Sequence, residues 1–164
     1  MKERKKGFTL IELLVVIAII GILATTLAPK LREQLAKAKD SKAIAVLGSA
    51  RTVANVILLE KIVLDSTSDG AIVISAQEIY DRLDSKAQSV YTNPGTHYLR
   101  IGGSKTEDDG ERSYGGSVYY TNFAGTNTEI TVSNDSLDFG LAPYISGGVP
   151  VKDYSMEGKK WTEY

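Results

Sequence analysis

The sequence is poor in the residues that form cross-links. It contains no cysteine and a single histidine, His97. A disulfide is therefore excluded, and so is a zinc site built from cysteine and histidine, which takes about four ligands. We expect His97, which begins a predicted strand, to have a structural or surface role. Packing, hydrogen bonds or a metal bound through oxygen ligands must then hold the domain together.

Recognisable catalytic motifs are also missing. The sequence has no glycine-rich phosphate loop, no nucleophile elbow and no identifiable pair of catalytic carboxylates. We therefore predict that the protein is not an enzyme and has no catalytic residues, no cofactor and no metal site. Calcium binding by the acidic stretch Glu107–Glu111, or by Asn134, Asp135 and Asp138, is the alternative, although the first stretch lacks EF-hand spacing.

Charge is distributed unevenly along the chain. Residues 1–7 carry a net charge of +3, residues 8–64 carry +3 and residues 65–164 carry −7, which together give the net charge of −1. Proteins bind nucleic acids largely by neutralising phosphates with lysine and arginine. We therefore expect no direct nucleic-acid binding by the acidic C-terminal part.

One long apolar run follows the basic start of the chain. Residues 8–28 include Glu12 as their only charged residue, and about 20 apolar residues suffice for a helix to cross the hydrocarbon core of a bilayer. In an ordinary secretory signal, the small-residue cleavage site follows the apolar core. Here the small residue, Gly7, precedes it. Cleavage after Gly7 would remove the basic leader and leave the apolar segment attached.

The eight residues from Lys5 to Glu12, Lys-Lys-Gly-Phe-Thr-Leu-Ile-Glu, resemble the class III signal of type IV pilins and the related pseudopilins. The resemblance implies that a prepilin peptidase cuts between Gly7 and Phe8 and that Phe8 is then N-methylated. It also implies that Glu12 is the acid of the family's N-terminal helix, and Pro29 lies where these helices commonly carry a proline. Many pilins close a C-terminal loop with a disulfide, and this chain departs from that pattern.

Glu12 has a physical reason to act in subunit assembly. An ionisable residue inside a membrane is costly and normally has a partner. After cleavage the nearest positive charge is the amine of Phe8, one helical turn away in the same chain, or that of a neighbour when subunits stack with a stagger. The alternative is that Glu12 is an interfacial acid reached by water and lipid headgroups.

Gly21 and Pro29 bracket a segment in which the helix is expected to open. Proline lacks an amide hydrogen and its ring crowds the carbonyl four residues back, here that of Thr25. In hydrocarbon the freed carbonyls need partners, and we expect the hydroxyls of Thr25 and Thr26 to make local hydrogen bonds. The alternative is a simple kink in a membrane helix.

The helical pattern continues beyond the apolar run. Between Leu31 and Leu58, apolar residues recur at steps of three and four, and turn-forming residues follow from Asp65 to Gly70. A helix over residues 8–64 would be about 85 Å long. We therefore divide the chain into a leader (1–7), a transmembrane or filament-core helix (8–28), an amphipathic continuation (29–64) and a globular head (65–164).

The head is expected to have an α+β fold. A capping box formed by Ser75 and Glu78 predicts a helix over residues 76–87. β-rich runs predict strands at 97–101, 117–123 and 129–133, the last two joined as a hairpin through residues 124–128. Residues 137–164 are expected to be loop with one or two short strands. We expect one antiparallel sheet, packed against the outer half of the long helix, with most tyrosines packed in the sheet and loops.

These features predict a structural subunit, specifically a major pilin, of an extracellular type IV pilus. Its partners would be other copies of itself, the prepilin peptidase, the assembly machinery and the cytoplasmic membrane. The basic leader predicts a single-pass topology with the N-terminus in the cytoplasm and the head outside, before the subunit joins the surface fibre. The alternatives are a pseudopilin of a type II secretion or DNA-uptake system, and a membrane-anchored binding module that does not polymerise.

Overall fold

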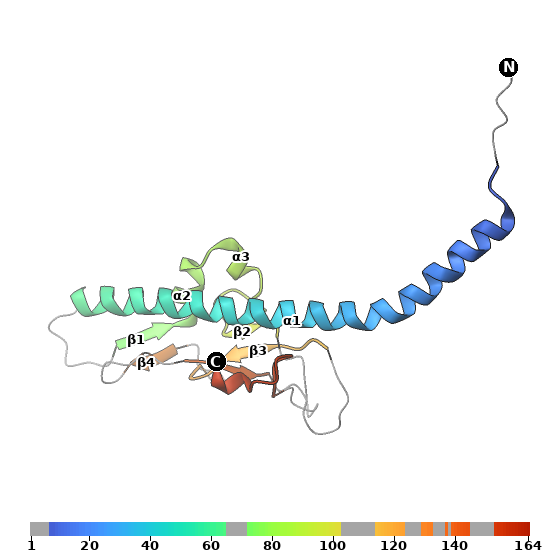
Figure 1. Ribbon diagram of the computed structural model, residues 1–164. Helices are drawn as coiled ribbons and strands as arrows, with labels where there is room; N and C mark the ends of the chain where they lie inside the picture. The colour runs from blue at the N-terminus through green and yellow to red at the C-terminus, as the bar shows by residue number, and fades with distance from the viewer. Residues whose placement is uncertain are drawn as a thin grey trace, which may run out of the picture. The chain divides into compact units, whose positions relative to one another are not determined.

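The computed structural model describes residues 7–64, 72–102, 114–123, 129–132, 137, 139–144 and 153–164 (Figure 1). These residues fall into two compact units that divide between Leu35 and Ala36. The first unit is helical. The second contains the remainder of the same helix together with all the strands. The α+β fold with a long N-terminal helix and antiparallel sheets is thereby confirmed.

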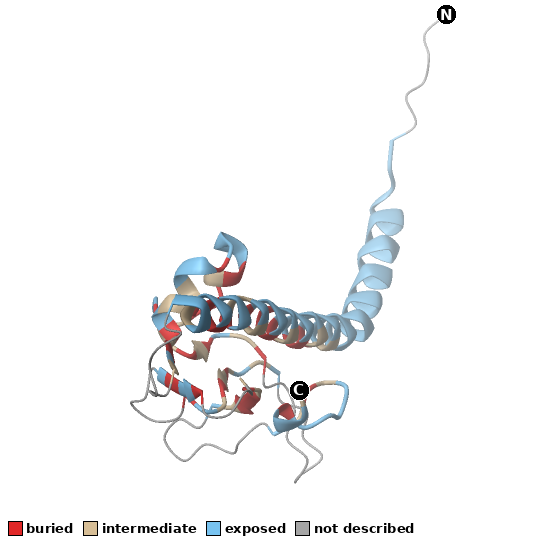
Figure 2. Ribbon diagram, turned by 90° about the vertical axis from the view of Figure 1, so that its left-hand side faces the viewer, coloured by how far each residue is buried: buried red, intermediate tan, exposed pale blue. Residues whose placement is uncertain are grey.

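Helix α1 spans Leu10–Leu64, which is 55 residues and includes Pro29. It begins two residues later than predicted because Thr9 caps its first turn, as described below. In the first unit its large apolar side chains are exposed, with Leu10 at 81% and Ile22 at 67%. Apart from Glu33, which is half-buried, this part of the helix is exposed (Figure 2).

In the second unit, α1 buries one face against the rest of the domain. The buried residues recur at steps of three and four, the period of a single helical face. They are Ala36, Asp40, Ala43, Val46, Leu47, Ala50, Ala54, Ile57 and Leu58. Alanine at three fully buried positions leaves room for the helix backbone to lie close to the core.

The capping box at Ser75 is confirmed, but the helix that it starts is shorter than predicted. Helix α2 spans Ala76–Arg82, and a separate helix α3 spans Ser85–Gln88. The break occurs because Asp84 is extended and caps α3, its carboxylate accepting hydrogen bonds from the backbone amides of Lys86 and Ala87. A side chain that caps a new helix cannot also continue the old one.

The strands form two antiparallel sheets where we expected one. Strand β1 (Ile72–Ser75) pairs with β4 (Glu129–Val132), and β2 (Tyr98–Leu99), β3 (Val118–Tyr120) and β5 (Leu141–Pro143) form the second sheet in the order β2-β3-β5. The predicted hairpin between β3 and β4 is therefore wrong. Strand β1 was not predicted, and it takes β4 as its partner because their apolar residues match in register, with Ile74 opposite Ile130.

The strand in the C-terminal part is β5, in line with the expectation of one or two short strands there. The chain ends in a short 3-10 helix, Trp161–Glu163. The predicted strands 97–101 and 117–123 are real but shorter than expected, at two and three residues. The turn cluster 65–70 and the loop 124–128 lie outside the described residues.

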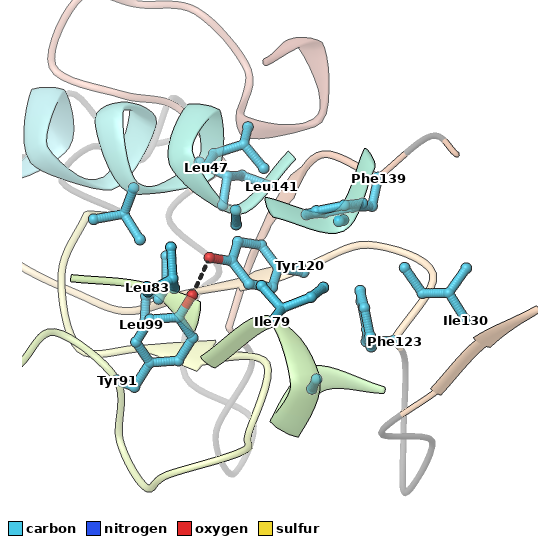
Figure 3. Packing of buried hydrophobic residues seen from close by; sticks show 14 of the residues in the cluster. Leu47, Ile79, Leu83, Tyr91, Leu99, Tyr120, Phe123, Ile130, Phe139 and Leu141 are labelled. Atoms are coloured by element: carbon cyan, nitrogen blue, oxygen red, sulfur yellow. Dashed lines mark hydrogen bonds between the residues drawn. The ribbon is translucent and has the colours of Figure 1, made fainter. Parts of the chain in front are cut away.

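The core of the second unit is rich in aromatic residues. Figure 3 shows Tyr120, Phe123 and Phe139 packed beneath Leu47 of α1. The rings of Phe123 and Phe139 meet edge to face, with centroids 5.6 Å apart. The hydroxyl groups of Tyr91 and Tyr120 hydrogen-bond to each other within the core, and burial raises the pKa of Tyr91 to about 12. Both phenols are therefore neutral and pack as predicted.

Polar contacts, one of them through the buried carboxylate of Asp40, join α1 to segments far along the chain. The Asp40 carboxylate, 3% exposed, accepts a hydrogen bond of 2.7 Å from the backbone amide of Met156. Arg51 donates through Nε to the carbonyl oxygen of Phe139 at 2.8 Å, and Lys61 forms an ion pair with Glu78 at 2.8 Å. These contacts attach the C-terminal segment and α2 to the long helix without a disulfide.

We predict that Asp40→Ala loosens the C-terminal segment, because the amide of Met156 loses its buried acceptor. Leaving a buried donor without a partner costs about 1–3 kcal/mol, and we expect the free energy of unfolding to fall by about that amount. Hydrogen exchange at Met156 should accelerate accordingly. Glu157→Gln, an exposed change in the same segment, is the matched control. Unchanged exchange at Met156 in Asp40→Ala would contradict the role of this contact.

Candidate functional site

The predicted cleavage site lies just before the long helix. Gly7, Phe8 and Thr9 are exposed and outside any helix or strand, so the bond between Gly7 and Phe8 is accessible in the intact chain. Gly7 does not have a positive φ angle, and a side chain added there would meet nothing within 4 Å. The fold therefore does not require glycine at this position, which leaves recognition by another molecule as a reason for it.

Thr9 and Glu12 form a capping box at the start of α1. The backbone amide of Thr9 donates to Glu12 Oε2 at 2.8 Å, and the backbone amide of Glu12 donates to Thr9 Oγ1 at 3.3 Å. The Thr9 hydroxyl also donates to Oε2, at 2.7 Å. This reciprocal arrangement satisfies amides that the first turn of a helix otherwise leaves without partners. The Thr-x-x-Glu pattern was visible in the sequence, but we did not predict this role.

The capping box uses only one oxygen of the Glu12 carboxylate. Within the described residues, every hydrogen bond that Glu12 accepts ends on Oε2. Oε1 is thus available to a further donor. The predicted pairing with the amine of Phe8 requires cleavage, because in the intact chain this nitrogen belongs to a peptide bond, and it stays a prediction.

The segment that follows Glu12 is apolar on every side. The side chains of Leu10, Ile17, Ile20 and Leu27 are all more than half exposed. Helix α1 is the only helix in the described parts of the chain that is long and apolar enough to cross a membrane, and its most apolar window has no buried residue. Between residues 7 and 35, the described part of its own unit, nothing covers this surface.

The segment bracketed by Gly21 and Pro29 is helical throughout. Thr25 donates its hydroxyl to the carbonyl oxygen of Ile22 at 2.8 Å, and Thr26 donates to that of Leu23 at 2.9 Å. The hydroxyls therefore make local hydrogen bonds as expected. Their acceptors lie about one turn before the carbonyl of Thr25, which is the one that Pro29 crowds. Opening of the helix between Gly21 and Pro29 remains a prediction.

His97 is buried, at 2% exposure, and its two ring nitrogens have no hydrogen-bond partner among the described residues. Its ring contacts that of Tyr98 in a tilted arrangement, with centroids 4.0 Å apart, and lies nearly parallel to Phe123. Burial lowers the pKa of His97, so the neutral imidazole is favoured. A structural role is in line with this position.

The sequence offered two stretches as alternatives for calcium binding. The acidic stretch Glu107–Glu111, and Asn134, Asp135 and Asp138, lie outside the described residues. In the part of the chain that the structure describes, no group of three acidic or histidine side chains is placed to hold a metal ion.

Comparisons with known proteins concern the same N-terminal region. Residues 2–28 match the family model of the prokaryotic N-terminal methylation motif. The chain is 43% identical over 60 residues to a type IV major fimbrial protein FimA of Dichelobacter nodosus, 42% over 71 residues to the fimbrial protein EcpB of Eikenella corrodens and 41% over 58 residues to a fimbrial protein of Pseudomonas aeruginosa.

The similarity covers only part of each protein. It extends over 37%, 42% and 35% of this chain in the three cases, and over 38%, 45% and 38% of the relatives. The chain thus matches less than half the length of these curated relatives. No solved structure matches it.

We predict that the second unit becomes less stable as the pH falls below about 6.5, the ordinary pKa of histidine. Because the folded-state pKa of His97 is lowered, the unfolded chain binds more protons in the window between that lowered pKa and 6.5. The free energy of unfolding therefore rises with pH through this window and is fully recovered above it. His97 is the only histidine, so His97→Phe should flatten the dependence measured by denaturation between pH 5 and 7.5.

Tyr114→Phe, which changes an exposed aromatic residue, is the matched control and should keep the wild-type dependence. The same slope in the wild type and His97→Phe would show that His97 does not cause it.

Proposed function

We propose that this chain, whose N-terminal segment is that of the type IV pilin family, is a non-enzymatic structural subunit of a type IV pilus. It polymerises through the first part of α1. The observation that supports this most directly is the first part of α1, residues 10–28, whose apolar side chains are exposed on every side and whose one acid, Glu12, lies in the first turn. The names of the relatives, a type IV major fimbrial protein among them, favour a major pilin over a pseudopilin.

The exposed segment needs a new environment, because burying apolar surface is worth about 25 cal/mol per Å². Before assembly the bilayer provides that environment, with the basic leader in the cytoplasm and the second unit outside. In the pilus, the same segments of other copies replace the lipid. A membrane-anchored module that does not polymerise would also have such a segment, but it would have no use for an acid there.

Maturation occurs between Gly7 and Phe8. A prepilin peptidase in the membrane removes the leader and Phe8 becomes the methylated N-terminus. The accessible, non-helical position of this bond and the open space around Gly7 support the assignment.

Glu12 selects the packing of neighbouring subunits. Its Oε2 stays within the capping box, while Oε1 receives the Phe8 amine of an adjacent copy. A charge buried in an apolar bundle is tolerated when it is paired, so assembly favours the stagger that brings the two groups together. Gly21 and Pro29 let the intervening helix open as the subunit leaves the bilayer.

We predict that the mature protein begins at methylated Phe8. N-terminal mass spectrometry of purified filaments should find this residue with one added methyl group. Gly7→Val should leave the second unit folded, since the fold has no need for glycine there, but should abolish processing. A mature chain that begins at Met1, or one cut beyond Ala24, would sink this assignment.

We also predict that Glu12→Gln sharply reduces filament number. The amide oxygen of glutamine can still accept from the Thr9 amide, so the helix start is kept, but the charge that pairs with Phe8 is lost. An uncompensated buried charge costs about 3–5 kcal/mol, so we expect yield, counted by electron microscopy, to fall to below about a tenth of wild type. Export and folding of the second unit should not change.

Thr9→Val is the matched control, because it removes the capping hydroxyl and keeps the carboxylate. Its filament yield should stay close to wild type. A normal yield from Glu12→Gln, or an equal loss in both variants, would instead assign Glu12 a capping role only.

A further inference from the structure

The β2-β3-β5 sheet has a second face that the core does not use. Leu99, Val118, Tyr120 and Leu141 point into the core. Because side chains alternate along a strand, the opposite face carries Tyr98 and Tyr119, which lie directly opposite each other in register. Ala142 is the next residue across the sheet.

Hydroxyl groups and one cation surround this pair. The backbone amide of Tyr144 donates to the carbonyl of Ser117, and that of Thr121 to the carbonyl of Gly140, so each pair is adjacent across β3 and β5. Arg100 lies two residues after Tyr98. The surface that we name the tyrosine face consists of Tyr98, Tyr119, Tyr144, Ser117, Thr121 and Arg100.

The three tyrosine rings form one connected group. The centroids of Tyr98 and Tyr144 are 4.9 Å apart with the rings nearly perpendicular, and those of Tyr98 and Tyr119 are 6.0 Å apart. Tyr144 is 44% exposed, and the other two are half-buried. Beneath them, the buried ring of His97 supports both Tyr98 and Tyr119. The rings are thus held in place before any ligand arrives, which reduces the entropy cost of binding.

Two polar side chains of the tyrosine face are engaged within the fold: the Thr121 hydroxyl accepts a hydrogen bond from the backbone amide of Gly140 at 2.6 Å, and the Arg100 guanidinium donates to the carbonyl oxygen of Thr92 at 2.7 Å. The three phenol groups differ. No hydrogen bond joins the hydroxyls of Tyr98, Tyr119 or Tyr144 to any residue that the structure describes. A tyrosine side chain combines an apolar ring with a polar tip. The face therefore offers apolar contact and hydrogen bonding side by side.

The charge of this face differs from that of the surrounding sequence. Residues 65–164 have a net charge of −7, yet the six described residues that make up the tyrosine face include no acid and one cation, Arg100. An acidic head disfavours nucleic acid, and a nearly uncharged face offers little to a strongly charged protein partner. It suits a ligand that has C–H surfaces and many hydroxyl groups but no charge.

We propose that the tyrosine face binds neutral carbohydrate. The C–H face of a hexose would lie against the rings of Tyr119 and Tyr144, and its hydroxyls would hydrogen-bond to the phenols, to Ser117 and Thr121, and to the Arg100 guanidinium. Binding by one chain does not depend on polymerisation. In the pilus proposed above, the same face is repeated on every subunit. Many weak sites on one fibre then add up to strong attachment.

The test uses the full chain, extracted from membranes in a polyoxyethylene detergent that contains no sugar. Binding is measured against the neutral polysaccharides cellulose, chitin and starch and the acidic polysaccharide alginate. We expect the wild type to bind at least one neutral polysaccharide. Tyr144→Ser and Tyr119→Thr should each weaken that binding by about tenfold or more. Tyr114→Ser, at another exposed tyrosine that lies outside the strands, should bind like the wild type.

Tyr144 is largely outside the core, so Tyr144→Ser is expected to fold, and its melting curve checks this. Failure of the wild type to bind any neutral polysaccharide would overturn the proposal, as would equal binding by the wild type and Tyr144→Ser. Binding to alginate alone, lost in high salt and in Arg100→Gln, would replace it with an ionic site. Filament counts for the same variants distinguish this proposal from the proposed role in a pilus. A variant that forms no filaments but whose monomer still binds the polysaccharide would have a defect in polymerisation only.

Discussion

An apolar helix that its own unit leaves uncovered must be buried elsewhere, and this requirement shapes the whole chain. The side chains from Leu10 to Leu27 are exposed on all sides of α1. A helix satisfies its backbone hydrogen bonds internally, so it is equally suited to lipid and to a bundle of other helices. The same segment can therefore be buried in either environment, with the proposed opening between Gly21 and Pro29 as the one change in its backbone. Each environment must also accommodate the carboxylate of Glu12.

The second unit meets a different requirement, which is to stay folded without covalent links. Its helical face packs closely through alanine, and the contacts that fix distant segments are polar. The hydrogen bond between Asp40 and Met156 joins residues that are 116 positions apart in the sequence. Arg51 reaches Phe139 in the same way. Where other chains would use a disulfide to close the C-terminal segment, a buried carboxylate performs that task here.

The sequence predicted what local patterns encode and failed where partners lie far apart. The long helix, the capping box at Ser75 and several strand positions follow from spacing within a few residues. The division into two sheets depends on which strands pair. The pairing of β1 with β4 joins residues that are over 50 positions apart in the sequence, so no local pattern predicts it. The role of Asp40 depends on the fold of the whole unit, so no local pattern announces it. In the N-terminal site, the positions of Gly7, Phe8 and Glu12 came from the motif, whereas the Thr9–Glu12 capping box was a local signal that we overlooked.

The capping box explains why the acid lies in the first turn of the helix. A carboxylate placed further along would have both oxygens without partners in lipid, at a cost of several kcal/mol. At Glu12, the Thr9 amide and hydroxyl satisfy Oε2 within the same chain, and the positive end of the helix dipole lies beside the negative charge. In the proposed pilus, only Oε1 then depends on another subunit. The residue would thus be tolerated in a single subunit and more stable in a correctly staggered pair, and under this proposal that difference gives assembly its direction.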